Sequence, residues 1–307
     1  MVQILGGPTD WVYFDGTVVL KQIIFVRICW DKIMEKSMLE QNINDERGQG
    51  GNPISYRPEI RIIAEDYEIP QLNRKRRISI LLPKSYGSSE KSYPVLYLHD
   101  GQNLFDGGGP FGNWAIDEKL SDLASKGMGD VIVVAIDHAE EERVLEFSPF
   151  KETKWGKGDG KKYLKFLVET LKPHIDKNFR TLKEREHTGV GGSSMGGLIS
   201  IYAGLRYPSV FGKLMIFSPS LWITPKIYFD AIAFHQPYPT DIYLYAGGAE
   251  SVNMVGNVKR LKQVLEDKNK EGAMVNIELH IDPQGKHEEW FWSQEFPAAM
   301  EFLYYRN

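Results

Sequence analysis

Short runs of β-branched and aromatic residues alternate with helical patterns from Pro58 to the end of the chain. Such alternation is typical of strands joined by crossover helices in a mostly parallel sheet. Runs that are apolar throughout indicate strands buried on both faces of that sheet. The runs that predict strands are 60–63, 77–82, 95–99, 131–136, 188–192, 213–217, 242–246 and 275–281.

Residues 163–177 have the period of an amphipathic helix, and residues 197–203 predict a second helix directly after the strand at 188–192. In the first segment the apolar residues share one side of the helix, which fits a helix lying on a sheet. These residues are Tyr163, Phe166, Leu167, Leu171 and Ile175. We therefore predict an α/β fold, a mostly parallel central sheet with helices on both faces.

Residues 1–57 differ from the rest, because their apolar and aromatic residues lack clean periodicity and a glycine-rich stretch follows at 47–53. That stretch predicts a linker. The segment before it is too small for a core of its own, so it is an extension packed on the main body or a poorly ordered tail. A natural start at Met34 or Met38 is a third alternative. We predict an N-terminal extension and linker over 1–57 and one catalytic domain over 58–307.

The composition is that of an ordinary globular protein, with 42% hydrophobic residues, 25% charged residues and a net charge of −4. There is no basic excess, so neither nucleic acid nor an anionic membrane is a predicted partner. Cys29 is the only cysteine, which excludes an intrachain disulfide and a thiolate metal cluster. The apolar run 18–30 contains Lys21 and Arg27 and is too short to span a membrane. These features predict a cytoplasmic protein.

Residues 192–196 match the pattern G-x-S-x-G, with Ser194 at its centre. In a nucleophile elbow this pattern forms a tight strand-to-helix turn that exposes a strained serine, and the glycines are needed where the backbone crosses itself. The predicted strand before Ser194 and the helix after it favour a nucleophile over a serine that only caps the helix. Ser193 is the rival, but it lacks the glycine pair.

A serine hydroxyl needs an imidazole base, and the imidazole needs a carboxylate to orient it. His287 lies in a glycine-containing loop after the last predicted strand, whereas His280 lies inside that strand. Glu250 follows a predicted strand and a Gly-Gly turn, while Asp230 and Asp241 are better interpreted as solvated charges. We predict His287 as the base and Glu250 as the acid, with surface positions as the alternative for both.

Ester hydrolysis also needs two backbone amides directed at the oxygen that becomes negative. The amide of Met195 is one candidate, because it directly follows Ser194 at the start of the predicted helix. The amide of Gln102 is the other, because Gly101 allows a sharp turn after the strand at 95–99. An ordinary Asp-Gly turn is the alternative explanation of the second segment.

Four segments together resemble one family of α/β-hydrolases, which includes enterochelin esterases, esterase D, feruloyl and acetylxylan esterases and mycolyltransferases. They are HDGQNLFD at 99–106, GGSSMGGLISIY at 191–202, SPSLW at 218–222 and GKHEEWFW at 285–292. The likeness is nearest to the branch of enterochelin esterases and predicted hydrolases, and it covers 58–307. It implies an α/β-hydrolase fold and an esterase that needs neither a metal nor an organic cofactor. It also implies that Trp222, Arg143 and Trp290 bind substrate, although packing or a surface ion pair, such as Arg143 with Glu146, explains them equally well.

The sequence therefore predicts a serine esterase that hydrolyses carboxylic esters through an acyl-enzyme, with a small-molecule ester as its partner. An acyltransferase with the same triad is one alternative, because an alcohol can replace water in the second step. A catalytically silent α/β-hydrolase fold that only binds a ligand is the other alternative. The pattern of residues decides neither the natural ester nor the oligomeric state.

Overall fold

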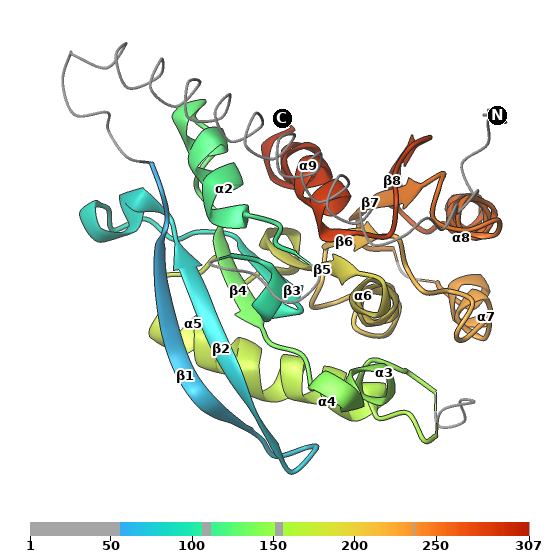
Figure 1. Cartoon of the computed structure of the whole chain (residues 1–307), viewed down its shortest axis with the longest axis horizontal. Helices are drawn as coiled ribbons and strands as arrows, with labels where there is room; N and C mark the ends of the chain where they lie inside the picture. The colour runs from blue at the N-terminus through green and yellow to red at the C-terminus, as the bar shows by residue number, and fades with distance from the viewer. Residues whose placement is uncertain (1–55, 106–111, 151–155, 236, 307) are drawn as a thin grey trace, which may run out of the picture. The chain divides into compact units, whose positions relative to one another are not determined.

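The computed structural model describes residues 56–105, 112–150, 156–235 and 237–306, so most of the predicted N-terminal extension lies outside the described residues. Within these ranges one sheet of eight strands has the order β1-β2-β4-β3-β5-β6-β7-β8 (Figure 1). The strands are β1 (Glu59–Ile69), β2 (Arg74–Leu82), β3 (Val95–His99), β4 (Ile132–Ile136), β5 (Thr188–Ser193), β6 (Lys213–Phe217), β7 (Thr240–Gly247) and β8 (Val275–Asp282). All eight predicted strands are present.

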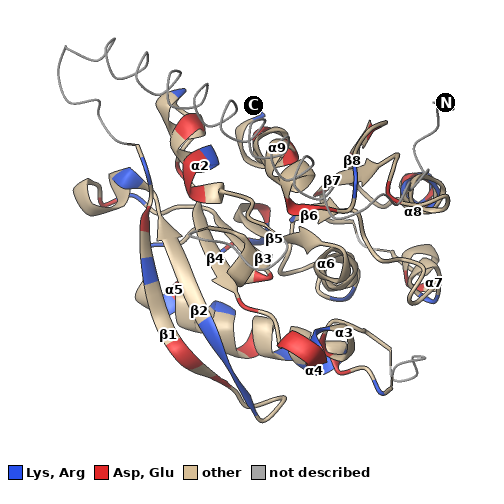
Figure 2. Cartoon of the chain, viewed as in Figure 1, with Lys and Arg blue, Asp and Glu red and all other residues tan. Residues whose placement is uncertain are grey.

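The sheet is parallel except at one end, where β2 pairs antiparallel with both β1 and β4. Strand β1 is longer than the predicted run 60–63, because its second half is polar and pairs with β2 through backbone hydrogen bonds. Lysines, arginines and carboxylates are interspersed along this antiparallel pair (Figure 2). A strand at the exposed edge of a sheet, such as β1, has little apolar periodicity. This explains why the sequence predicted only part of β1.

Both faces of the sheet are covered by helices, as predicted. On β3, Val95 and Tyr97 contribute to one apolar core, and Leu96 and Leu98 to the other. The first core includes residues of α4 (Gly160–Phe166), α5 (Lys172–Asn178), α6 (Met195–Arg206), α7 (Ile227–Ile232) and α8 (Met254–Asn269). The second includes residues of α2 (Ile116–Ser125) and α9 (Glu289–Met300), so the central strands are buried on both sides.

The helix predicted over 163–177 is interrupted, because a π-helical segment, Leu167–Leu171, lies between α4 and α5. Pro173 stands in the first turn of α5. A proline cannot donate a backbone hydrogen bond, and its ring clashes with the carbonyl four residues earlier, here that of Glu169. Wider π-type turns are a usual response to such a conflict.

One buried charge connects the antiparallel end of the sheet to the loop region after β4. Glu146, the last residue of α3 (Arg143–Glu146), has no exposed surface, and its carboxylate accepts hydrogen bonds from Arg74 at 2.9 Å and Arg76 at 2.8 Å. Both arginines belong to β2. This ion cluster therefore fixes α3 against β2.

Glu146→Gln should lower the free energy of unfolding by about 3 kcal/mol, because it leaves two guanidinium groups next to a buried neutral amide. Glu59→Gln is the matched control, since the Glu59 carboxylate pairs with Arg61 at an exposed position and should contribute at most about 1 kcal/mol. Urea unfolding followed by circular dichroism measures both variants. Equal midpoints for the two would contradict the assigned role of Glu146.

Candidate active site

The carboxyl ends of the parallel strands meet at one edge of the sheet, and the loops that follow them form the site. Asp100 follows β3, Ser194 follows β5, Ser218 follows β6 and Glu250 follows the end of β7. His287 lies in the loop between β8 and α9. Ligand sites of α/β sheets typically form at this edge, so residues far apart in the chain become neighbours.

Ser194 connects β5 to α6 with φ 57° and ψ −118°, a backbone conformation that is strained for a residue with a side chain. The chain crosses itself here, because a Cβ placed on Gly192 would lie 3.1 Å from the backbone of Gly196. A Cβ on Gly196 would lie 2.9 Å from Asp100 Oδ2. The Ser194 amide donates to the carbonyl of Phe217 at 2.9 Å. The segment thus has the geometry that its G-x-S-x-G pattern predicts.

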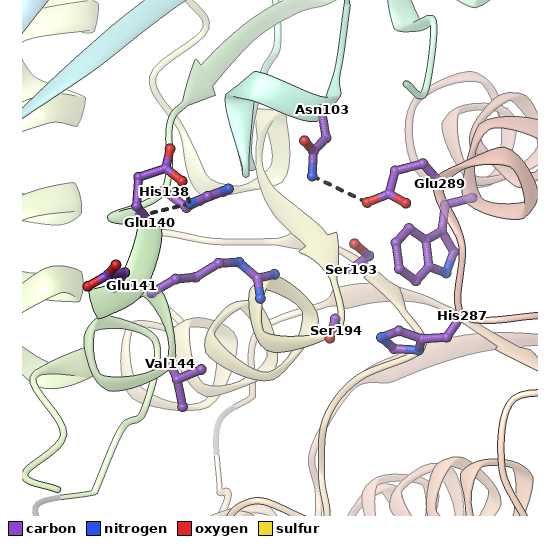
Figure 3. Close-up of a pocket in the computed structure, with 11 residues that line it drawn as sticks. Asn103, His138, Glu140, Glu141, Val144, Ser193, Ser194, His287 and Glu289 are labelled. Atoms are coloured by element: carbon purple, nitrogen blue, oxygen red, sulfur yellow. Dashed lines mark hydrogen bonds and ion pairs between the residues drawn. The ribbon is translucent and has the colours of Figure 1, made fainter. Parts of the chain in front are cut away.

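The Ser194 hydroxyl is hydrogen-bonded to the buried Ser220, with 3.2 Å between the two Oγ atoms. Ser194 and His287 line the same pocket and lie side by side in Figure 3. Both residues belong to the described part of the chain, and no hydrogen bond joins the Ser194 and His287 side chains there. Catalytic hydrogen bonds are often long or poorly aligned before a substrate binds, so this arrangement is compatible with a resting site.

His287 Nδ1 lies 2.7 Å from Glu250 Oε2. The Glu250 side chain is only 1% exposed, whereas that of His287 is 39% exposed. Two further donors reach the other carboxylate oxygen, namely the Gly247 amide at 2.7 Å and the Ser218 hydroxyl at 2.5 Å. The structure therefore places Ser194 and His287 at one pocket, and the buried Glu250 carboxylate, which does not line that pocket, pairs directly with His287.

The pocket has a volume of about 520 Å³. Its lining residues are Asn103, His138, Glu140, Glu141, Arg143, Val144, Ser193, Ser194, His287, Glu289 and Trp292. Arg143 holds the nearby Asp100 carboxylate with two hydrogen bonds, Nε at 2.5 Å and Nη2 at 2.8 Å. The alternative pairing of Arg143 with Glu146 is wrong, because Arg143 binds Asp100 and Glu146 binds the arginines of β2 instead.

The remaining predicted residues lie around this pocket. Met195 is the first residue of α6, and Gln102 lies in a 3₁₀ turn, Gly101–Asn103. The Gln102 side chain accepts from the His138 amide at 2.8 Å and so ties the loops after β3 and β4 together. Trp222 and Trp290 are 54% and 62% exposed and do not line the pocket, so their contact with a substrate stays a prediction.

Sequence reasoning missed the part of the pocket that follows β4 and the part that begins α9. His138, Glu140, Glu141 and Val144 belong to the first part. Their sequence matches no catalytic motif, but β4 ends at the same edge as β3 and β5, which was a usable signal. Glu289 and Trp292 belong to the second part and stand within GKHEEWFW, the segment that was singled out for His287.

Burial shifts the pKa values of several ionisable groups at or near the pocket. His99, the last residue of β3, is 1% exposed, and burial lowers its pKa to about 4. Its Nδ1 lies 2.8 Å from the Tyr163 hydroxyl. Burial also raises the pKa of Glu289, whose carboxylate accepts from the Asn103 side-chain amide at 3.3 Å. The pocket wall near His287 therefore includes the buried, polar side chain of Glu289.

A family model described as "Putative esterase" matches residues 69–303, which is most of the chain. The chain belongs to this family. It is accordingly a carboxylic ester hydrolase, and the predicted family resemblance is confirmed. The two regions that carry the pocket, the loops after the parallel strands and the start of α9, both lie within the matched residues.

Two relatives show how far the likeness extends in sequence. The chain is 28% identical to "Uncharacterized protein YbbA" of Bacillus subtilis over 244 residues, which are 76% of this chain and 94% of that protein. It is 27% identical to an endo-1,4-beta-xylanase/feruloyl esterase of Xylanibacter ruminicola over 157 residues, which are 48% of this chain and 20% of that protein. The second match thus concerns only a small part of the longer relative.

Solved structures share the fold at lower identity. The BES protein from Bacillus cereus aligns with a TM-score of 0.65 and 22% identity, over 84% of this chain and 98% of that one. The enterobactin esterase FES from Shigella flexneri aligns with a TM-score of 0.64 and 19% identity, over 82% of this chain and 61% of that one. These alignments support the α/β-hydrolase fold. Among the helices that the structure describes, none combines the length and apolarity needed to cross a membrane.

Acidification should destabilise the fold through His99. The pKa of His99 is lower in the folded protein, about 4, than the ordinary 6.5, so the unfolded chain binds the proton first as the pH falls. The stabilisation is complete above pH 6.5 and is lost toward pH 4, by at most about 3 kcal/mol. Urea unfolding at several pH values should show a shallower pH dependence for His99→Gln than for the wild type. Identical slopes would contradict this assignment.

Proposed function

We propose that this chain is a serine esterase that forms an acyl-enzyme, with Ser194 as nucleophile, His287 as general base and Glu250 as the acid that orients the base. The observation that carries the proposal is the 2.7 Å contact between His287 Nδ1 and the buried Glu250 carboxylate, beside a strained serine in the same pocket. Membership of an esterase family supports it from the sequence side.

In the first step Ser194 Oγ attacks the carbonyl carbon of the ester, and His287 Nε2 takes the hydroxyl proton. The Ser194 hydroxyl has to turn from Ser220 toward His287 before it attacks. The carbonyl oxygen becomes negative, and the amides of Met195 and Gln102 are proposed to stabilise it. His287 then gives the proton to the departing alcohol, and water repeats the sequence to release the acid.

The substrate is proposed to be a small ester with hydrogen-bonding groups near its reacting carbonyl. A pocket of about 520 Å³ is within the usual range for small-molecule sites. Its wall offers the Asn103 amide, the Arg143 guanidinium and the Glu289 carboxylate, which suit hydroxyl or carbonyl groups of a ligand. Relatives named for feruloyl esters and enterobactin give two starting points for a substrate screen.

Hydrolysis is favoured over acyl transfer because the base is accessible to water, as the 39% exposure of the His287 side chain indicates. An acyltransferase needs a site that excludes water from the acyl-enzyme. We therefore assign the transferase activity second place. The acyltransferase and the hydrolase would share Ser194, His287 and Glu250, so only the fate of the acyl group separates them.

Fluorophosphonate labelling should modify Ser194 in the folded wild type, as mass spectrometry of the labelled peptide would show. Ser194→Ala should abolish labelling and reduce kcat for p-nitrophenyl acetate by about 10⁴-fold or more, because the nucleophile is lost. Ser193→Ala should keep the label, since it retains the elbow serine. Labelling of Ser193 or Ser220 in place of Ser194, or an unlabelled wild type, would contradict the proposal.

Water should remain the main acyl acceptor when an alcohol competes with it. With p-nitrophenyl acetate as the substrate, in a solvent of water and glycerol at equal volume fractions, free acetate should exceed glyceryl acetate. The reason is that the exposed base admits water as readily as the alcohol. Product ratios measured by chromatography decide this. Predominant transfer to glycerol, or to a sugar at millimolar concentration, would make the acyltransferase the better assignment.

A further inference from the structure

The hydrogen bonds around Glu250 begin at Trp292, on the first turns of α9. The indole Nε1 of Trp292 lies 3.0 Å from Ser218 Oγ. An indole N–H can only donate, so the Ser218 oxygen must be the acceptor of this bond. Trp292 is 3% exposed and Ser218 has no exposed surface, so bulk water does not compete for either group.

The direction of this first bond determines that of the second, and the carboxylate determines the third. Ser218 has one proton, and the remaining partner of its hydroxyl is Glu250 Oε1 at 2.5 Å. An ionised carboxylate only accepts hydrogen bonds, and the Gly247 amide also donates to Oε1. Oε2 is hydrogen-bonded to His287 Nδ1 at 2.7 Å, so this nitrogen must carry the proton. The His287 Nε2 atom is left as the free acceptor that a general base requires.

We propose that Trp292 and Ser218 are positioning residues, which hold the Glu250 carboxylate in place and so set the orientation of His287. Trp292 acts twice, because its ring also packs edge-on against the imidazole, with 4.9 Å between ring centroids and an 87° angle between planes. This inference rests on the proposed function, since it assigns the two residues a role in preparing His287 as the base. Neither residue touches the reacting atoms in this scheme.

The fold contains a chemically matched set of groups away from Ser194, which serves as a control. The Tyr243 hydroxyl donates to Glu295 at 2.5 Å, and His280 Nδ1 lies 2.7 Å from the same carboxylate. Hydroxyl, buried carboxylate and imidazole thus occur in the same order, but none of the three residues lines the pocket. Tyr243→Phe removes a buried hydroxyl–carboxylate bond of the kind that Ser218→Ala removes.

Steady-state kinetics with p-nitrophenyl acetate test the proposal on the full chain. Ser218→Ala should lower kcat about tenfold with little change in KM, as loss of one hydrogen bond to a charged group predicts. Trp292→Phe should lower kcat about threefold, because it removes a weaker neutral bond. In Ser218→Ala the acidic limb of the pH profile should move to higher pH, since a carboxylate with one donor fewer attracts the imidazole proton more strongly. Tyr243→Phe should leave kcat and the pH profile as in the wild type.

Two further measurements separate a positioning role from a loss of stability. In a Glu250→Gln background, Ser218→Ala should cause no further loss of kcat, because its effect passes through the carboxylate. Nitrogen-15 NMR of labelled His287 should show the Nδ1–H tautomer in both the wild type and Ser218→Ala, because the ionised carboxylate accepts in both, and the imidazole should gain its second proton at a higher pH in Ser218→Ala. Additive losses, a second protonation of His287 at the same pH in Ser218→Ala as in the wild type, or equal effects of Tyr243→Phe and Ser218→Ala would overturn the inference. If Glu250→Gln and His287→Gln keep the wild-type rate, the proposed triad itself fails, whereas their inactivity with a fully active Ser218→Ala overturns only the positioning role.

Discussion

The constraint on which the site depends is the burial of one carboxylate, that of Glu250. A charge with 1% exposure is costly unless donors surround it, and its donors come from three different segments. Gly247 lies at the end of β7, Ser218 follows β6, and His287 belongs to the loop after β8. Satisfying this single charge therefore brings three loops together at the edge of the sheet and leaves the imidazole facing the pocket.

The strained turn at Ser194 is the second element that the sheet supports. Its amide bonds to the carbonyl of Phe217 on the neighbouring strand β6, and the two glycines around it allow the backbone to cross. Strain of this kind persists only where the surroundings determine the conformation fully. The parallel strands β5 and β6 supply those surroundings, since both are buried on both faces. Rigid strands thus place Ser194, while His287, the proposed base, lies on a more exposed loop.

The sequence predicted the central strands most accurately, and β3 and β6 agree with it at both ends, because strands buried on both faces are apolar throughout. The polar half of β1 and the π-helical segment after α4 gave no such signal. The chain order of serine, carboxylate and histidine was readable because parallel strands bring successive loops to one edge. The bond between Trp292 and Ser218 was not readable, since it joins residues 74 positions apart that belong to no common period. The ion-pair partner that the sequence suggested for Arg143 was wrong for a related reason. Proximity in sequence suggested Glu146, whereas in the fold Arg143 binds Asp100.

The most direct measurement of the central claim is a crystal structure of the protein after reaction with a phosphonate ester, which imitates the tetrahedral intermediate. The account predicts a bond from phosphorus to Ser194 Oγ and one phosphonate oxygen within hydrogen-bonding distance of the Met195 and Gln102 amides. His287 Nε2 should face the ester oxygen that remains on phosphorus, which stands in for the oxygen of the departing alcohol, while Nδ1 stays on Glu250. A phosphonate attached to another residue, or one whose oxygen points away from both amides, would contradict the account.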